Sequence, residues 1–183
     1  MTYPLTVIAG PTAVGKGTVV SYIKEHYPNV HISVSATTRE PRPGEVDGIN
    51  YFFLSHSEFD ELIQSGEMLE YAVVHGSNKY GTPRKPVEEA LAKGLLVILE
   101  IDIQGARQVK QAMPSAKTIF IAPPSWDELV RRLTSRGTES AEEQAIRLNT
   151  ARLELAAQSE FDHVVINDEV ARCAGEVVEL VQA

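Results

Sequence analysis

The sequence has little cysteine, no long apolar run and few positive charges. Cys173 is the single cysteine among 183 residues, so no disulfide can form within the chain, and we expect it to be a helix residue without chemistry. No apolar stretch approaches the roughly 18 residues that a membrane-spanning helix needs, and the first residues show no basic and apolar signal pattern. These absences predict a protein of the reducing cytoplasm that has no membrane partner.

Acidic residues outnumber basic ones, 25 to 17, which gives a formal net charge of −8. A protein that grips phosphates along a nucleic-acid strand usually carries a net positive face, so this balance argues against a nucleic-acid partner. Local arginines can still bind small phosphates. The five histidines show no metal-ligand spacing, so we do not expect a metal site built on them.

A glycine-rich loop follows the first apolar run, residues 5–9. Its sequence is Gly10-Pro11-Thr12-Ala13-Val14-Gly15-Lys16-Gly17-Thr18, and a helical pattern comes next. Gly10 and Gly15 can take backbone conformations closed to residues with a Cβ, so successive N–H groups can surround an anion at the helix N-terminus. Lys16 would reach the outer phosphates of a nucleoside triphosphate. An ordinary glycine-rich turn is the alternative, which the agreement of strand, spacing, lysine and helix disfavours.

One position in this loop departs from the usual motif. Gly17 stands where a hydroxyl residue normally follows the lysine, and Thr18 comes one residue later. That hydroxyl normally ligates Mg²⁺. Thr18 is therefore only a candidate ligand, and we expect water and phosphate oxygens to carry most of the metal.

Apolar runs alternate with helical patterns, which predicts an α/β fold with a parallel sheet flanked by helices. The expected core strands are 5–9, 31–35, 95–101, 118–121 and 163–166, and the expected helices are 18–27, 104–112, 126–136, 141–158 and 170–181. Residues 36–85 are rich in glycine and proline, with strand patterns at 51–54 and 68–74, and predict an inserted, mostly antiparallel module.

Residues 123–150 begin with Pro123-Pro124 and continue as an arginine-rich helical stretch, which is typical of a mobile flap. We expect one domain, with a core of residues 1–35, 86–122 and 159–183. The insert would be 36–85 and the lid 123–158.

Arg39 and Arg42 lie three residues apart on a loop that Pro41 and Pro43 stiffen. Guanidinium forks match phosphate oxygens, and the prolines lower the entropy lost in holding them. A solvated, charged loop explains these residues equally well when they are taken alone.

The chain resembles the guanylate kinases, which are P-loop nucleoside monophosphate kinases. The resemblance runs in order across essentially the whole chain, through the loop 10–18, Ser33-Val34-Ser35-Ala36-Thr37-Thr38-Arg39-Glu40-Pro41-Arg42-Pro43-Gly44-Glu45, Tyr80-Gly81, Leu99-Glu100-Ile101-Asp102-Ile103-Gln104-Gly105 and Pro123-Pro124-Ser125. It implies a P-loop NTPase core with a GMP-binding insert and a helical lid. The implied reaction moves the γ-phosphoryl of ATP to GMP with Mg²⁺, so ATP and GMP would be the partners.

The resemblance also implies roles for single residues. The catalytic residues would be Lys16, Arg39, Arg136 and Arg147. The GMP-binding residues would be Ser35, Arg39, Arg42, Tyr51, Glu70, Tyr80, Thr82 and Asp102. ATP would contact the loop 10–18 together with Arg132, Arg136 and Asn167, the last of which falls where the family holds adenine. We assign Glu100 to the water shell of Mg²⁺.

The chemistry of these side chains favours guanine over adenine. Guanine presents N1–H and N2–H₂ donors side by side, so the carboxylate of Glu70 can accept both, while hydroxyls of Ser35 and Thr82 can donate to O6 or N7. The N1 atom of adenine is an acceptor and would face a carboxylate lone pair. Alone, Glu70 would be interpreted as a surface carboxylate of its strand.

The lid arginines have two interpretations. Arg132 and Arg136 lie four residues apart on one helical pattern and Arg147 lies on the next. They could form salt bridges with nearby acids such as Glu128, or a closing flap could bring them to the charge of a phosphoryl-transfer transition state. Arg131 faces another direction, so we expect it to be structural.

Two other functions fit parts of the sequence. A kinase for a phosphorylated ribose would share the loop, flap and arginines but would have little use for Glu70. A catalytically silent guanylate-kinase-like module that binds phosphopeptides would share the arginine clamp but would not need Lys16. The sequence leaves open whether the chain forms a homo-oligomer.

Overall fold

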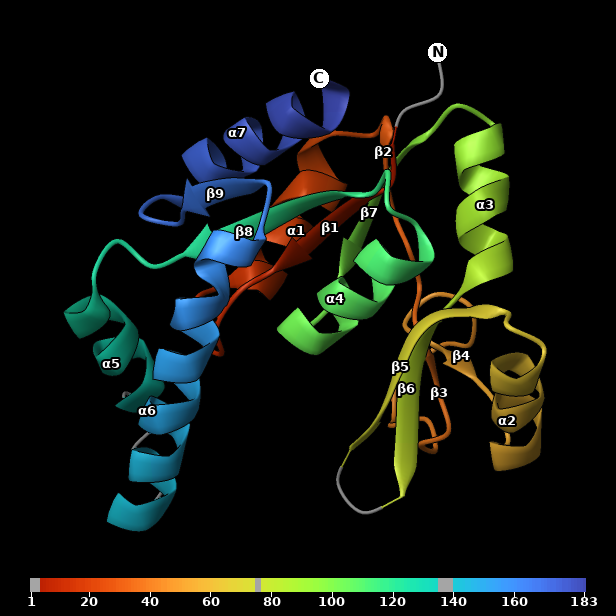
Figure 1. The fold of residues 1–183 in the computed structure, drawn as a ribbon, viewed down its shortest axis with the longest axis horizontal. Coiled ribbons are helices and arrows are strands. Elements are labelled where there is room, and N and C mark those ends of the chain that lie inside the picture. The colour runs from red at the N-terminus through yellow and green to blue at the C-terminus, as the bar shows by residue number, and fades with distance from the viewer. Residues whose placement is uncertain (1–3, 75–76, 135–139) are drawn as a thin grey trace.

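Five parallel strands form the central sheet of the computed structural model, which describes residues 4–74, 77–134 and 140–183 (Figure 1). Their order is β2-β7-β1-β8-β9 and each pairs in parallel with its neighbour. The strands are β1 (Thr6–Ala9), β2 (Val30–Ile32), β7 (Leu96–Glu100), β8 (Lys117–Ala122) and β9 (His163–Ile166). The predicted α/β fold with a parallel sheet is confirmed.

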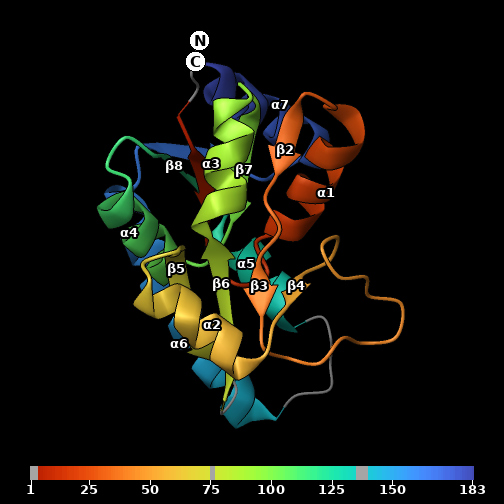
Figure 2. The ribbon, with the colours of Figure 1, turned by 90° about the vertical axis from the view of Figure 1, so that its right-hand side faces the viewer.

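Helices bury both faces of this sheet. Successive side chains of a strand point to opposite faces, so one strand contributes to both apolar clusters. In β1, Ile8 joins the apolar cluster on one face and Val7 the cluster on the other, and both are fully buried. Figure 2 shows the helices of the two faces on opposite sides of the strands. The first face is covered by α1 (Lys16–His26) and α7 (Val170–Gln182), the second by α3 (Arg84–Ala92) and α4 (Ile103–Ala112). Cys173 is buried in α7, the helix in which it was expected.

A second, smaller sheet has the order β4-β3-β6-β5. β6 is antiparallel to both of its neighbours, whereas β3 and β4 are parallel, so the prediction of a mostly antiparallel module is confirmed. Phe59 of α2 (His56–Gln64) is fully buried in the small core on one side of this sheet. The strands are β3 (Ala36–Thr37), β4 (Phe52–Phe53), β5 (Met68–Val74) and β6 (Asn78–Pro83).

The chain crosses from one sheet to the other between β2 and β3. Ser33 still donates its N–H to Ile98 O of the central sheet at 2.9 Å, and Ser35 O already accepts from Phe52 N of the second sheet at 2.9 Å. The expected strand 31–35 is therefore wrong at its end, because β2 stops at Ile32. This crossing places Ser35 at the junction of the two sheets.

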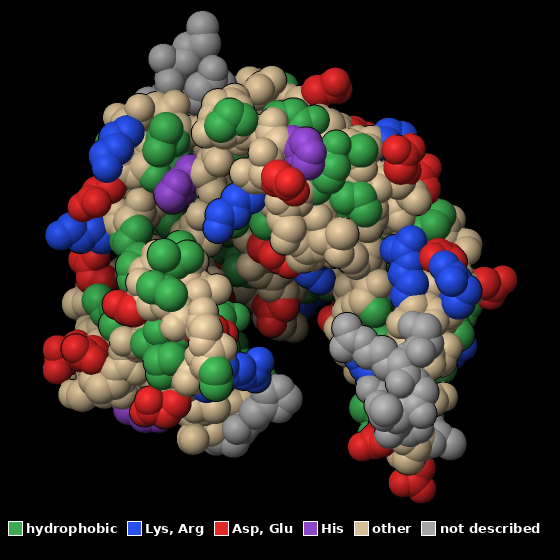
Figure 3. Space-filling model, turned by 180° about the vertical axis from the view of Figure 1, so that it is seen from behind, with side chains coloured by type: hydrophobic (Ala, Val, Ile, Leu, Met, Phe, Trp, Pro, Cys, Tyr) green, Lys and Arg blue, Asp and Glu red, His purple; other side chains and the backbone are tan. Residues whose placement is uncertain are grey.

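Two helices after β8 form a separate lobe. They are α5 (Trp126–Thr134) and α6 (Ala141–Ala156), and a 3₁₀ turn at Ala157–Glu160 follows. The guanidinium of Arg152 lies 5.0 Å from the centre of the Trp126 ring and ties the two helices together. Figure 3 shows a notch between this lobe and the lobe of the second sheet, with charged side chains along it. None of the helices in the described ranges is both long and apolar enough to cross a membrane.

We predict that Phe59→Ala lowers the free energy of unfolding by about 3 to 5 kcal/mol, because it empties the largest fully buried position of the small core. Urea denaturation measures the change. Phe59→Leu keeps much of the side-chain volume and should lose less than half as much. A loss below about 1 kcal/mol for the alanine variant would contradict this packing.

Candidate active site

The loop between β1 and α1 has a backbone that only glycine can supply at two positions. Gly10 has a φ of 154°, and a Cβ there would lie 2.4 Å from the carbonyl oxygen of Ile121. Gly15 has a φ of 94° and caps α1. Ala13 also has a positive φ, 64°, although it carries a Cβ. Such conformations are typical of functional loops, where they aim backbone N–H groups at a ligand.

Lys16 begins α1 with its ammonium turned back over this loop. Its Nζ donates to Gly10 O at 2.6 Å and to Pro11 O at 3.2 Å. Burial lowers the pKa of Lys16, and the nearby carboxylates of Glu154, Glu100 and Asp102 oppose that shift. An ammonium group has three donors, so phosphate oxygens can share it with the loop carbonyls.

Two of the predicted ATP-site residues hold the loop from outside. Asn167, at the end of β9, is 4% exposed, and its Nδ2 donates to Val14 O at 2.9 Å. Arg132 of α5 donates from Nη1 to the same oxygen at 3.0 Å and from Nη2 to Asn167 O at 3.3 Å. The structure therefore brings Arg132 and Asn167 to the phosphate-binding loop.

Glu128 links the two adjacent arginines of α5. Its carboxylate accepts from Arg131 at 2.7 and 2.8 Å and from Arg132 Nε at 2.8 Å, and these bonds, first to Arg131, lower the pKa of Glu128 to about 2. The Arg131 side chain is otherwise exposed. Arg147 lies half-buried on α6. Arg136 lies outside the described residues.

A cavity of about 190 Å³ lies between the second sheet and the carboxyl end of β7. Glu100 belongs to this cavity and also approaches the loop, since its Oε1 lies 3.6 Å from the position that a Cβ on Gly17 would occupy. The cavity therefore adjoins the phosphate-binding loop. Six of its lining residues had been assigned from the sequence: Ser35, Tyr51, Glu70, Tyr80, Glu100 and Asp102.

Glu70 projects from β5 into this cavity and is only 7% exposed. Its Oε1 accepts from the Thr82 hydroxyl of β6 at 2.7 Å. Burial raises the pKa of Glu70 to about 7, the Thr82 bond opposes this, and the charge of Asp102 adds to it. The Thr82 hydroxyl is thus bonded to Glu70, where the sequence had suggested that it donates directly to a base.

Arg39 lies beside the aromatic rings of Tyr51 and Phe53. Its guanidinium carbon is 5.5 Å from the centre of the Tyr51 ring, and the rings of Tyr51 and Tyr80 meet edge to face at 6.1 Å. The two terminal nitrogens of Arg39 donate to Glu45 at 2.9 and 3.0 Å, and Arg42 N donates to Glu45 at 2.7 Å. These bonds, first the one from Arg39, lower the pKa of Glu45. In the predicted phosphate clamp, Arg39 and the backbone of Arg42 therefore bind Glu45, a carboxylate of the same loop. The Arg42 side chain is exposed.

Glu100, the last residue of β7, and Asp102, which follows the strand, have different partners. Asp102 caps α4, where its Oδ1 accepts from Gly105 N at 2.7 Å. Burial raises the pKa of Glu100, and the charge of Lys16 opposes that shift. Thr18 is exposed in the first turn of α1. Within the described ranges, no group of three His, Cys, Asp or Glu side chains could hold a metal ion.

One contact of the loop was missed by sequence reasoning. Glu154 of α6 accepts the N–H of Thr12 at 2.9 Å, across 142 positions of sequence. Its carboxylate accepts a hydrogen bond from a backbone N–H group of the kind that binds phosphate. No local signal distinguishes Glu154 from the other glutamates of its helix, because the contact depends on how α6 packs.

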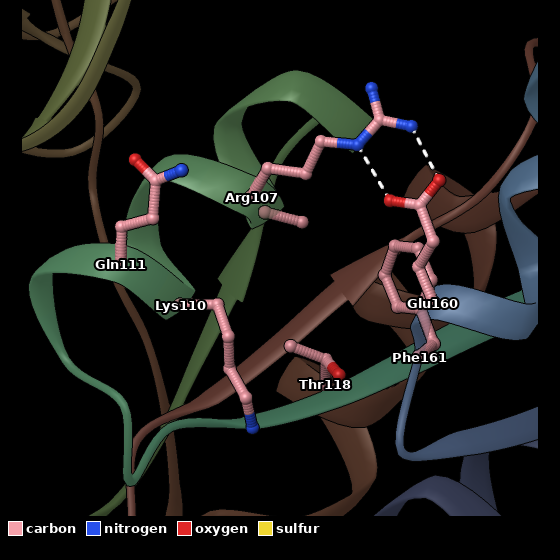
Figure 4. Close-up of a pocket in the computed structure, with 7 residues that line it drawn as sticks. Arg107, Lys110, Gln111, Thr118, Glu160 and Phe161 are labelled. Carbon is pink, nitrogen blue, oxygen red and sulfur yellow. Dashed lines mark hydrogen bonds and ion pairs between the residues drawn. The ribbon is translucent and has the colours of Figure 1, made fainter.

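A separate cavity of about 260 Å³ lies away from the loop, between α4 and the segment that follows α6 (Figure 4). Arg107 donates two bonds of 2.6 Å to Glu160 across it, and Lys110 donates to Asp162 at 3.0 Å. These cations are paired within the protein. The cavity shares no residue with the one that contains Glu70.

Comparison with known proteins agrees with this geometry. The family model "Guanylate kinase" matches residues 3–183. The chain is 63% identical over 176 residues to a guanylate kinase of Leifsonia xyli subsp. xyli, which covers 96% of this chain and 69% of that protein. It is 56% identical over 177 residues to a guanylate kinase of Nocardia farcinica, with 96% and 92% covered.

A solved structure gives the same result. The crystal structure of guanylate kinase from Anaplasma phagocytophilum matches with a TM-score of 0.75 and 33% identity, over 99% of this chain and 85% of that one. Sequence and structure agree across the phosphate-binding loop, both sheets and the helical lobe, and the chain belongs to the guanylate kinase family.

Proposed function

We propose that this protein transfers the γ-phosphoryl of ATP to GMP, giving ADP and GDP. The observation that carries this conclusion is the buried carboxylate of Glu70, which lines a cavity next to a phosphate-binding loop. Glu100 lines that cavity and also approaches Gly17 of the loop, so an acceptor nucleotide in the cavity would lie beside a bound triphosphate. Membership of the guanylate kinase family supports the same reaction.

Glu70 would select guanine by accepting N1–H and N2–H₂ with its two oxygens. The Thr82 hydroxyl holds Oε1 at 2.7 Å, which fixes the plane of the carboxylate before a base arrives. Adenine would place an acceptor against the same group and leave a buried carboxylate without its bond. Ser35 and Asp102 line the same cavity and would complete the contacts to GMP.

The acceptor phosphate would be held by Arg39, Arg42, Tyr51 and Tyr80. Arg39 is already oriented by Glu45 and by the Tyr51 ring. A phosphate monoester oxygen is largely ionised at pH 7, so it can attack without a general base. In-line transfer then depends on position and charge, with no covalent intermediate.

On the ATP side, the loop 10–18 would surround the phosphates while Lys16 draws charge onto the β- and γ-phosphates. Asn167 and Arg132 support the loop through Val14 O and would border the adenine. We propose that Arg136 and Arg147 reach the transferred group when the lid, residues 123–158, closes together with the insert, residues 36–85. Closure would exclude water, because an open site would hydrolyse ATP.

Mg²⁺ fits the donors that are present. Glu100 supplies one carboxylate beside the loop, and Mg²⁺ commonly takes one or two carboxylates together with waters and phosphate oxygens. We propose that Glu100 holds the ion through water, with Thr18 as a second candidate ligand. The ion would neutralise charge on the β- and γ-phosphates when it is bound. We further propose a cytoplasmic protein with ATP and GMP, and no nucleic acid or membrane, as its partners.

The decisive experiment is an assay of ADP release with GMP, AMP, UMP or ribose bisphosphate as acceptor. We expect turnover with GMP and at least about 100-fold lower kcat/KM with the others, since a site that hydrogen-bonds its substrate strongly rejects analogues without those groups. Preference for ribose bisphosphate would contradict the proposal. Binding of phosphopeptide without turnover would do so as well.

Lys16→Ala should abolish turnover and leave the fold intact, because the ammonium supplies charge to the phosphates and little packing. Circular dichroism measures the fold, and the assay of ADP release measures turnover. Lys85→Ala, an exposed lysine on α3, is the matched control and should keep full activity. A folded Lys16→Ala protein with near-native kcat would rule out the proposed role of Lys16.

Glu70→Gln should lower kcat/KM for GMP by about 30- to 1,000-fold, or on the order of 2 to 4 kcal/mol, because an NH₂ donor replaces one acceptor. The KM for ATP should hardly change. An equal loss for GMP and AMP would mean that Glu70 supports the fold and does not contact the base.

The stability of the same variant relative to the native protein should rise with pH. Glu70 has an ordinary pKa of 4.5 and a folded pKa of about 7, so its ionisation destabilises the folded protein progressively as pH rises through about 7. Glutamine does not ionise. We expect the free energy of unfolding of Glu70→Gln relative to the native protein to be higher at pH 8 than at pH 5 by on the order of 3 kcal/mol or less, and its relative Tm to rise accordingly. A constant Tm difference across this range would contradict the raised pKa.

Gly17→Ser should lower the Mg²⁺ concentration needed for half-maximal activity by about 3- to 10-fold, because it restores a hydroxyl ligand beside Glu100. A Cβ at this position would lie 3.6 Å from Glu100 Oε1, an ordinary contact, so the side chain fits. Gly17→Ala adds the same Cβ without the hydroxyl and serves as the control. Identical Mg²⁺ curves for the two variants would contradict a metal at this place.

A further inference from the structure

Helix α4 packs along the edge of the second sheet and bonds to its outer strand through a side-chain amide. β5 is an edge strand of that sheet. Gln108 bonds to the outward backbone of Tyr71 in β5, where its Oε1 accepts Tyr71 N–H at 3.1 Å and its Nε2 donates to Tyr71 O at 3.1 Å. The amide thus takes the place of a neighbouring strand at the residue that follows Glu70.

Gly105, one turn earlier on α4, leaves room for the Glu70 carboxylate itself. A Cβ on Gly105 would lie 3.0 Å from Glu70 Oε2 and 3.3 Å from Asp102 Oδ1. The other oxygen of Glu70 is held by the Thr82 hydroxyl. The carboxylate is therefore confined between Thr82 of its own sheet and Gly105 of α4.

The helix that provides these two contacts belongs to the core. Ala106 and Val109 of α4 are buried in the cluster that covers one face of the central sheet, and Asp102 caps the helix by accepting Gly105 N. Because α4 packs on the central sheet, it fixes the position of Glu70 relative to the sheet that carries the phosphate-binding loop.

We propose that Gly105 and Gln108 are positioning residues for guanine recognition, Gly105 by leaving space for Glu70 Oε2 and Gln108 by fixing the β5 backbone at Tyr71. This inference rests on the proposed function. Two parallel hydrogen bonds to a base need both carboxylate oxygens in place, so a displacement of a few tenths of an ångström weakens both.

If Gly105 had a purely structural role, its replacement would lower the stability of the protein and would not selectively weaken GMP binding. The residue lies within α4, where alanine is a better helix former than glycine. The gain in helix propensity offsets the crowding of the new Cβ against Ile101 Cδ1 at 3.2 Å, so Gly105→Ala should change the Tm by only a few degrees while it weakens GMP binding. Loss of GMP binding without loss of stability separates positioning from folding.

The test is a double-mutant cycle with Glu70→Gln. We expect Gly105→Ala and Gln108→Leu each to raise the KM and the calorimetric Kd for GMP by about 5- to 30-fold in the native background, with the KM for ATP unchanged. In the Glu70→Gln background each should change them by less than about 2-fold, because the group that they position no longer accepts both donors. Gln111→Leu, an exposed glutamine on the same helix, is the matched control and should have no effect in either background.

Equal factors in the two backgrounds, or a Gly105→Ala protein with native affinity for GMP, would overturn the inference. Gln108→Leu also removes a contact between α4 and the second sheet, so its GMP affinity is interpreted only if its Tm shows that it is folded. If Gln108→Leu unfolds, the result for Gly105→Ala decides. A native protein that does not phosphorylate GMP would instead overturn the proposed function. The two failures are therefore distinguishable.

Discussion

The parallel direction of the central strands is the constraint on which the site depends. Parallel strands bring their carboxyl ends to one edge of the sheet, and ligands of open α/β sheets bind there. Each strand end contributes a different part of the site. β1 leads into the phosphate-binding loop, β2 into the crossing at Ser35, β7 into Glu100 and Asp102, β8 toward the helical lobe, and β9 into Asn167. Reversal of any one of these strands would remove its contribution from this edge.

Within this frame, the protein satisfies its phosphate-binding groups with its own atoms. Arg39 bonds to Glu45, Lys16 bonds to carbonyls of its loop, and the Thr12 N–H bonds to Glu154. Buried or half-buried cations need such partners, because an unpaired charge away from water is strongly unfavourable. Substrate phosphates would therefore exchange with existing partners, so the measured affinity is a difference between two sets of bonds.

Much of the fold could be predicted because its signals are local. Apolar runs that alternate with helical patterns located the central strands, and glycine spacing with Lys16 located the loop. Helix α2 was missed although Ser55 and Glu58 form a capping box at its start. Helix α3 was also missed, although Pro83 at its N-cap and Pro86 in its first turn occupy positions that a helix tolerates. The end of β2 was misplaced because the alternation of polar and apolar residues continues after Ile32, through Ser33-Val34-Ser35, while the chain changes sheets.

The parts of the site that sequence reasoning could not supply are the long-range contacts. The pairing of Thr82 with Glu70 depends on the register of β5 and β6, and the bond from Thr12 to Glu154 depends on the packing of α6. The resemblance located the residues Arg39 and Glu45, but their bidentate pair appears only in three dimensions. Patterns along the chain identify residue types, whereas distances between elements decide which groups interact.

The contact between Glu154 and the Thr12 N–H has a kinetic meaning. A carboxylate tethered to the same molecule acts as a competitor whose effective concentration is fixed by the chain, commonly in the millimolar range, and cannot be diluted. Each departing phosphate would be replaced at once by this internal anion, which shortens the time for which the loop is without a partner and opposes rebinding of the product. The same anion would compete with an incoming phosphate, so the packing of the helical lobe enters the affinity of the loop for its ligand in both directions.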